Sequence, residues 1–104
     1  MSKYNTIEVW NVRFGNRETV NDYAGRIIKK SACGNPSSAY HPTLDHIRPL
    51  SKGGCDVPEN IIICHRDTNR EKANSFPHWT ANGHMFKAIR ERGCRTGYEI
   101  VDNE

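Results

Sequence analysis

Residues 45–72 read DHIRPLSKGGCDVPENIIICHRDTNREK, and this stretch decides the fold of the chain. It predicts a strand, a loop, a second strand and a helix over residues 43–48, 51–59, 61–63 and 67–75. Pro49 ends the first strand because it cannot donate to a sheet. The loop contains two adjacent glycines, and the second strand is a short run of isoleucines. Pro77 closes the helix.

Polar side chains occupy positions in this stretch where a hairpin packed on a helix would bring them together. Asp45 and His46 put an oxygen ligand and a titratable base at one strand end. Asn69 and Lys72 are spaced i, i+3 and therefore share one helix face, which His65 also shares if the helix begins that early. A hard-metal oxygen site, a base and a cation suit the hydrolysis of phosphodiester bonds.

This combination resembles the HNH endonuclease family, whose fold is the ββα-metal domain. The resemblance rests on Asp45-His46, the loop IRPLSKGG over 47–54, Asn60, and TNREK over 68–72. It implies a small α+β single domain with a ββα-metal centre, flanked by an N-terminal helix and strand and a C-terminal β-hairpin. It also implies a metal-dependent DNA endonuclease of low sequence specificity, which nicks DNA or cuts both strands.

The resemblance also assigns roles to particular residues. Asp45 corresponds to the metal carboxylate of the family, and His46 to the general base that deprotonates the attacking water. Asn60 corresponds to an asparagine that ties the loop to the backbone and steadies the histidine. Asn69 falls where family members carry a histidine or asparagine that binds the metal, and Lys72 matches a basic position beside the scissile phosphate.

The expected cofactor is one divalent metal ion, Mn²⁺ or Mg²⁺, because Asp45 and Asn69 both offer oxygen ligands. His65 is left with three alternatives: a third metal ligand, a phosphate contact, or a helix-start residue with no role in the site.

The chain departs from the many HNH proteins that bind a structural zinc through two CxxC pairs. Lys30 stands where a partner of Cys33 would be, and His65 and Thr68 occupy the positions of the second pair. We therefore expect no structural zinc, and the flanking strands and hairpin must supply the missing stability.

The charge distribution has two interpretations: a solvated surface of mixed charge, which the charges alone favour, or a face that binds a polyanion. The formal net charge is +3, and the basic residues after His65 outnumber the acids, which favours DNA as the partner. The candidate phosphate contacts are Arg66, Arg70, Arg90, Arg92 and Arg95. A catalytically inactive DNA-binding module on the same scaffold is the alternative function.

Length and composition limit the rest of the architecture. A chain of 104 residues fits one domain over 1–104, with the motif core at about 43–76. Short elements are predicted on both sides of the motif: a helix over 17–24, a strand over 26–32, and a hairpin with arms over 85–92 and 98–101. Trp79 and Phe76 are interpreted as packing residues.

The sequence also carries expectations about cellular context. No apolar run is long enough to span a membrane, and the first ten residues do not form a secretory signal. We therefore expect a cytoplasmic protein with reduced cysteines. A monomer is favoured for nicking, and the sequence leaves the oligomeric state open.

Overall fold

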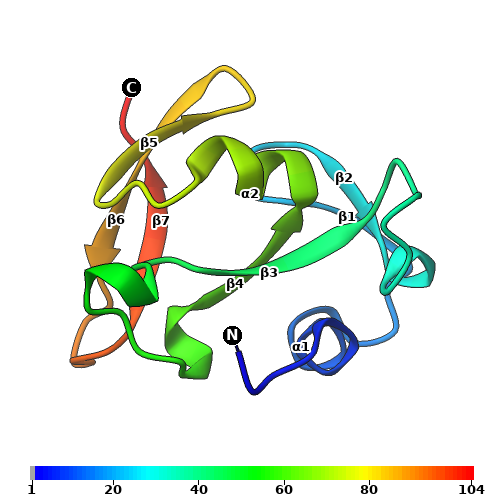
Figure 1. Cartoon of the computed structure of the whole chain (residues 1–104), viewed down its shortest axis with the longest axis horizontal. Helices are drawn as coiled ribbons and strands as arrows, with labels where there is room; N and C mark the ends of the chain where they lie inside the picture. Colours follow the sequence, from blue (N-terminus) through cyan, green and yellow to red (C-terminus); the bar gives the residue numbers. More distant parts are fainter. Residues whose placement is uncertain (1) are drawn as a thin grey trace.

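The structure is a computed structural model, and it describes residues 2–104. Two α-helices and seven β-strands are present among these residues (Figure 1). The elements are α1 (Thr6–Phe14), β1 (Thr19–Asn21), β2 (Ile27–Lys29), β3 (Pro42–His46), β4 (Ile61–His65), α2 (Arg66–Lys72), β5 (His78–Ala81), β6 (His84–Arg90) and β7 (Tyr98–Asp102). The strands form three antiparallel sheets, β1-β2, β3-β4 and β5-β6-β7. The predicted α+β class with a ββα centre is confirmed.

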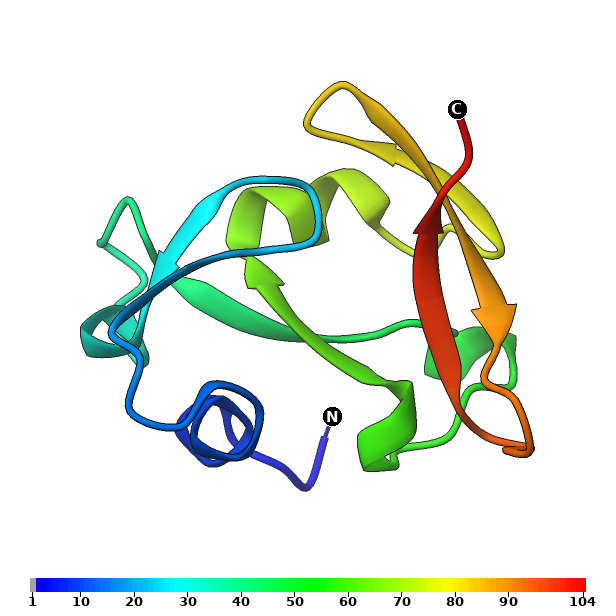
Figure 2. The ribbon, with the colours of Figure 1, turned by 180° about the vertical axis from the view of Figure 1, so that it is seen from behind.

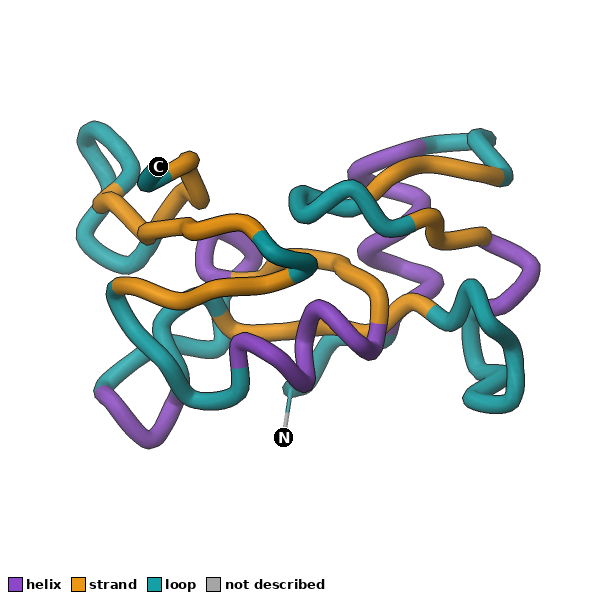
Figure 3. The backbone as a smooth tube through the Cα atoms, turned by 90° about the horizontal axis from the view of Figure 1, so that it is seen from above, coloured by secondary structure: helices purple, strands orange, loops and turns teal. Residues whose placement is uncertain are grey.

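The β3-β4 hairpin crosses the middle of the molecule (Figures 1 and 2). Its register pairs Asp45 with Ile62 and His46 with Ile61. Figure 3 shows the β5-β6-β7 sheet and the β1-β2 hairpin at opposite ends, with the β3-β4 hairpin between them. Because side chains alternate along a strand, Ile62 packs against one hydrophobic core and Ile63 belongs to the other.

The two cores differ in the elements that build them. The larger one joins the β5-β6-β7 sheet to the residues around the hairpin and contains Ala24, Ile47, Trp79, Ala81, Phe86, Ala88 and Tyr98. The smaller one joins α1 to β2 and β4 through Trp10, Ile28 and Ile63. Trp79 is thus a core residue, as predicted, and Phe76 packs against the same core. The β3-β4 hairpin is thus supported from both sides by packed side chains.

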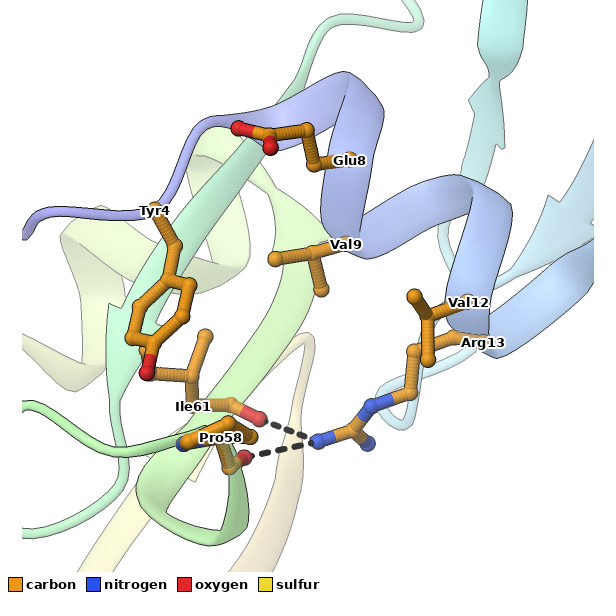
Figure 4. Close-up of a pocket in the computed structure, with 7 residues that line it drawn as sticks. All are labelled: Tyr4, Glu8, Val9, Val12, Arg13, Pro58 and Ile61. Atoms are coloured by element: carbon orange, nitrogen blue, oxygen red, sulfur yellow. Dashed lines mark hydrogen bonds between the residues drawn. The ribbon is translucent and has the colours of Figure 1, made fainter.

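Helix α1 was not predicted, although its start and end have clear local causes. The Asn5 side chain accepts a hydrogen bond from the Glu8 backbone N–H at 2.9 Å and caps the helix. Gly15 ends it in a positive-φ conformation. Arg13 donates from the last turn to the carbonyls of Pro58 and Ile61 beside the hairpin (Figure 4). This bond fixes α1 beside the start of β4.

The helix predicted over 17–24 is wrong. Residues 19–21 form strand β1 instead, and the chain turns after it toward β2. The Asp22 carboxylate accepts hydrogen bonds from the backbone N–H groups of Ala24 and Arg26, and Gly25 adopts a φ of 91°. A side chain that binds its own following backbone favours a turn over a helix.

The other predicted elements are present with shifted ends. The strands expected over 26–32 and 43–48 are shorter, the one expected over 61–63 extends to His65, and the loop contains two single helical turns. The C-terminal hairpin is confirmed as β6 and β7, and β5 adds an unpredicted third strand. Helix α2 stops at Lys72 because Ala73 takes a φ of 50°. No helix within residues 2–104 has the length and apolar character needed to cross a bilayer.

An exposed ion pair holds α2 to β2 and gives the fold an acid-sensitive contact. The Glu71 carboxylate accepts from the Arg26 guanidinium at 2.7 Å and from the Asn82 backbone N–H at 2.8 Å. These two bonds lower the pKa of Glu71 from 4.5 to about 2. Because the pKa is lower in the folded chain, the stabilisation is present above pH 4.5 and is lost as the pH falls toward 2.

We therefore expect Glu71→Gln to weaken the fold near neutral pH and to flatten the loss of stability in acid. Urea unfolding midpoints for wild type and variant should converge as the pH falls from about 5 to 2. Glu99→Gln changes an exposed acid on β7 and should leave the curve parallel to that of wild type. A constant difference between Glu71→Gln and wild type over this range would contradict the prediction.

Candidate active site

Asn60 fixes the loop that joins β3 to β4. It is fully buried, and its side-chain oxygen accepts from the Arg48 backbone N–H at 2.9 Å. Its amide nitrogen donates to the carbonyls of Arg48 and Cys55 at 3.1 and 2.9 Å, and its own carbonyl accepts from the Ile47 N–H. Asn60 therefore ties the loop to the backbone directly after His46, and its steadying of the histidine stays a prediction.

Two glycines allow the loop to fold back on itself. Gly53 has a φ of 88°, a left-handed conformation that favours glycine. A Cβ atom at Gly54 would lie 1.8 Å from the Arg48 carbonyl oxygen, so no larger residue fits there without moving the backbone. The SKGG turn is thus required to bring residues 55–60 next to the end of β3.

Asp45 and Lys72 form a buried ion pair at the centre of the site. The Lys72 ammonium is fully buried and lies 3.3 Å from the Asp45 Oδ2 atom. It also donates to the His46 carbonyl at 3.2 Å and lies 5.0 Å from the centre of the Trp79 ring. Burial raises the pKa of Asp45, and the neighbouring Lys72 ammonium opposes that rise. Asp45 Oδ2 is buried, and within residues 2–104 its contact with Lys72 is an ion pair and not a well-directed hydrogen bond.

Burial of Lys72 bears directly on its predicted place beside the scissile phosphate. An ammonium with no exposed surface cannot contact DNA without leaving Asp45. Its contacts are with the backbone and carboxylate of the two residues at the end of β3. The geometry therefore makes Lys72 a residue that holds Asp45 and His46 in place.

Asn69 lies on α2 facing β3, as the i, i+3 spacing with Lys72 required. Its amide nitrogen lies 3.0 Å from Thr43 Oγ1 and 3.3 Å from the Leu44 carbonyl oxygen. These two acceptors immediately precede Asp45 in the strand. They fix the amide group, and no group within residues 2–104 donates a hydrogen bond to its oxygen. The Asn69 oxygen is thus available as a ligand.

His46 has a contact that the sequence did not predict. Its Nε2 atom lies 2.8 Å from the Asp56 carboxylate. Asp56 also accepts from the Ser2 hydroxyl at 2.7 Å and from the Lys3 backbone N–H at 2.8 Å. These hydrogen bonds lower the pKa of Asp56, with the Lys3 bond as the largest cause. No spacing rule links Asp56 to His46, because the contact depends on how the loop folds.

His65 and Thr68 stand where the second CxxC pair would be, and both are buried. The His65 Nδ1 atom accepts from the Asp67 backbone N–H at 3.0 Å and caps α2, while Nε2 contacts the Ala39 carbonyl at 2.7 Å. Thr68 donates to the Asp22 carboxylate at 2.6 Å. Both ring nitrogens of His65 are therefore engaged inside the chain, which corresponds to the helix-start alternative.

The predicted phosphate contacts on α2 have an acidic neighbour. Arg70 lies 3.0 Å from the Asp67 carboxylate, and Arg66 lies 3.8 Å from it. Asp67 therefore offsets part of the positive charge that these two residues would offer to DNA.

In the C-terminal sheet, acidic neighbours offset less of the positive charge of the predicted phosphate contacts. Arg90, Arg92 and Arg95 are exposed, and no acid forms an ion pair with them among residues 2–104. Arg90 and Arg48 each donate to the Tyr98 hydroxyl at 3.1 Å. Arg48, two residues after His46, thus connects the site to this basic turn. The sequence did not predict this contact, because a single arginine has no pattern that indicates its partner.

The chemistry of the donor set fits a hard divalent cation. Asp45 contributes a buried carboxylate oxygen with an unused lone pair, and Asn69 contributes a free amide oxygen. Residues 2–104 contain no cluster of three or more histidine, cysteine, aspartate or glutamate side chains placed to bind a metal. All four cysteines are free. A cation held by these two oxygens would need water or substrate oxygens to complete its coordination.

An apolar hollow of about 230 Å³ lies away from these residues. It is lined by Tyr4, Glu8, Val9, Val12, Arg13, Pro58 and Ile61, between α1 and the start of β4 (Figure 4). The Arg13 guanidinium in it is bound to two backbone carbonyls. None of the predicted site residues lines it, so it contributes nothing to the chemistry described above.

Comparison with known families gives one match. Residues 23–78, which are 56 of the 104 residues, match a family described as HNH endonuclease. The matched region contains β2, the β3-β4 hairpin and α2, and ends at the start of β5. Searches of curated proteins and of solved structures found no match.

The Asp45–Lys72 pair makes a prediction about stability. Lys72→Met keeps the length of the side chain but leaves the buried carboxylate without its cation, which should cost about 3–5 kcal/mol. Asp45→Asn in the same chain removes that carboxylate and should recover much of the loss, because replacing both members of a buried pair is often nearly neutral. Urea unfolding of wild type, both single variants and the double variant measures the coupling. Additive losses would show that the two residues do not depend on each other.

Proposed function

The chain belongs to the HNH endonuclease family, and from this premise we propose that it cleaves DNA with one divalent cation held by Asp45 and Asn69 and with His46 as general base. Membership makes the chain a phosphodiester hydrolase with DNA as its substrate. The observation that carries the finer proposal is the buried Asp45 carboxylate, whose Oδ2 atom faces the Lys72 ammonium at 3.3 Å, at the strand end that packs against the helix face carrying Asn69.

His46 is suited to accept the proton of the attacking water. Its side chain is 17% exposed, so solvent reaches it, while Lys72 and Asn60 bind the His46 carbonyl and the Arg48 N–H that follow it. A positioned imidazole that takes a proton in the transition state contributes about 10²–10⁴-fold to a rate. Asn60 and Lys72 act through this positioning and do not touch the substrate.

Asp45 and Asn69 are suited to hold the cation. The amide of Asn69 is anchored by its nitrogen, which leaves its oxygen as the ligand atom. When bound, a divalent cation would stabilise the negative charge that develops on the phosphate and on the leaving oxygen. Two protein ligands impose little geometry, and Mg²⁺ demands a nearly ideal octahedron. We therefore propose that Mn²⁺ supports cleavage best and Mg²⁺ less well. His65 is not included in this site because both of its ring nitrogens are engaged elsewhere.

DNA binding is proposed to depend mainly on the basic turn between β6 and β7. Arg90, Arg92 and Arg95 are exposed there, and Arg48 lies next to them through the Tyr98 hydroxyl. Contacts from arginine to phosphate carry no sequence information, so affinity should depend on salt and little on sequence. This supports cleavage of low sequence specificity.

Replacing the base tests the proposed activity. His46→Ala should reduce plasmid cleavage in Mn²⁺ by about 10²–10⁴-fold, while DNA binding measured by fluorescence anisotropy stays near that of wild type. His84→Ala removes a histidine that is 56% exposed, on the β5-β6-β7 sheet, and should cleave normally. A wild-type chain that binds DNA but does not cut it in any divalent metal would instead establish the inactive DNA-binding module.

Replacing the amide ligand tests the metal site. Asn69→Ala should lose most Mn²⁺ affinity, measured by calorimetric titration of the metal into the protein without DNA. Asn69→His should shift the preference toward Zn²⁺ and Ni²⁺, because imidazole suits those ions. Asn16→Ala removes an exposed asparagine outside the site and serves as the control. Mn²⁺ binding by Asn69→Ala that equals wild type would exclude Asn69 as a ligand.

A further inference from the structure

We propose that Asp56 is a positioning residue that holds His46 as the tautomer protonated on Nε2, so that Nδ1 is the nitrogen that accepts the proton of water. The inference rests on the proposed function for its catalytic consequence, whereas the tautomer itself is a property of the free protein. Nothing in the motif spacing assigns a role to Asp56.

The hydrogen bonds of the Asp56 carboxylate determine which nitrogen carries the proton. Asp56 Oδ1 lies 2.8 Å from His46 Nε2 and accepts from the Ser2 hydroxyl at 2.7 Å, while Oδ2 accepts from the Lys3 backbone N–H at 2.8 Å. An ionised carboxylate can only accept hydrogen bonds, and these donors keep the carboxyl ionised by lowering its pKa. Nε2 must therefore be the donor.

This assignment leaves the other nitrogen free for chemistry. A neutral imidazole has one N–H and one lone pair, so protonation of Nε2 puts the lone pair on Nδ1. No group within residues 2–104 forms a hydrogen bond with Nδ1 of His46. A base whose second nitrogen is held by an acceptor keeps both its tautomer and its ring orientation. Asp56 supplies both constraints to His46.

The amino-terminal segment in turn orients Asp56. The Lys3 backbone N–H can only donate, and the Ser2 hydroxyl can donate or accept. In Asp56→Asn, the side-chain oxygen must stay opposite the Lys3 N–H, which places the amide NH₂ opposite His46. That NH₂ group donates to Nε2 and stabilises the opposite tautomer, protonated on Nδ1. Asparagine is thus expected to disable the base, although it has nearly the same shape as aspartate.

Asp56→Ala should have a milder effect than Asp56→Asn. Alanine removes the preference for either tautomer and leaves the competent one partly populated. We expect cleavage to fall on the order of 10-fold in Asp56→Ala and on the order of 10²–10⁴-fold in Asp56→Asn, as when a general base is lost. A purely structural role predicts the reverse order, because asparagine preserves the shape of the site better. DNA affinity should be unchanged in both variants.

Two measurements test the proposal. Two-bond ¹H–¹⁵N correlations of the imidazoles in metal-free protein, at a pH where they are neutral, identify the protonated nitrogen of His46 in each chain. Single-turnover cleavage with Mn²⁺ gives the rates. Asp102→Asn is the matched control, since it makes the same exchange at an exposed acid on β7, and it should match wild type in both measurements.

The expected result is an Nε2–H tautomer in wild type, an Nδ1–H tautomer in Asp56→Asn, and a lower cleavage rate for Asp56→Asn than for Asp56→Ala. An Nε2–H tautomer that persists in Asp56→Asn, or an Asp56→Asn rate at or above that of Asp56→Ala, would overturn the role of Asp56. If the wild-type chain does not cleave DNA, the proposed function fails, and the tautomers of wild type and Asp56→Asn alone decide the positioning role.

Discussion

A fully buried lysine is the constraint on which the rest of this structure depends. The Lys72 ammonium has no exposed surface and is held by the Asp45 carboxylate, the His46 carbonyl and the face of Trp79. A buried charge without such partners is strongly destabilising, so α2 can occupy only one position against the end of β3. The same contact orients the two residues proposed to carry the chemistry. Stability and catalytic geometry therefore depend on one ion pair.

The chain stabilises this centre with hydrogen bonds at positions where other HNH proteins carry zinc ligands. Asp22 is buried and accepts from the His65 backbone N–H and the Thr68 hydroxyl, which ties the β1-β2 turn to the start of α2. Thr68 also accepts from Arg26 at 3.1 Å. A metal site joins distant segments through one ion. Here the buried Asp22 carboxylate joins the β1-β2 turn to His65 and Thr68 through hydrogen bonds. Together with the capping bond of His65, they fix the start of the helix that carries Asn69 and Lys72.

The sequence predicted the central hairpin and helix well because their signals are local. Lys72 contacts the Asp45 carboxylate and the His46 carbonyl, and Asn69 contacts the two residues before Asp45, as the shared helix face predicted. The failures came from long-range contacts. The family resemblance placed Lys72 beside the phosphate, and nothing local shows that its ammonium is buried against Asp45. Asp56 contacts His46 only because the SKGG turn folds back and the amino-terminal segment binds the Asp56 carboxylate. Asp22 binds the backbone that follows it, so residues predicted as a helix form a β-hairpin instead.

In the proposed mechanism, Lys72 also determines how strongly Asp45 can attract a cation. The ammonium lies 3.3 Å from Oδ2 and already balances one negative charge, so the site presents little net charge to a divalent ion. Asn69 adds an oxygen but no charge. The DNA phosphate then supplies the negative charge that the divalent ion needs. Both the metal and the nearby arginines attract this phosphate. Metal and DNA should consequently bind with positive coupling, each strengthening the affinity for the other. Such coupling predicts that a scissile phosphate strengthens cation binding at Asp45 and Asn69 beyond the affinity of the DNA-free protein.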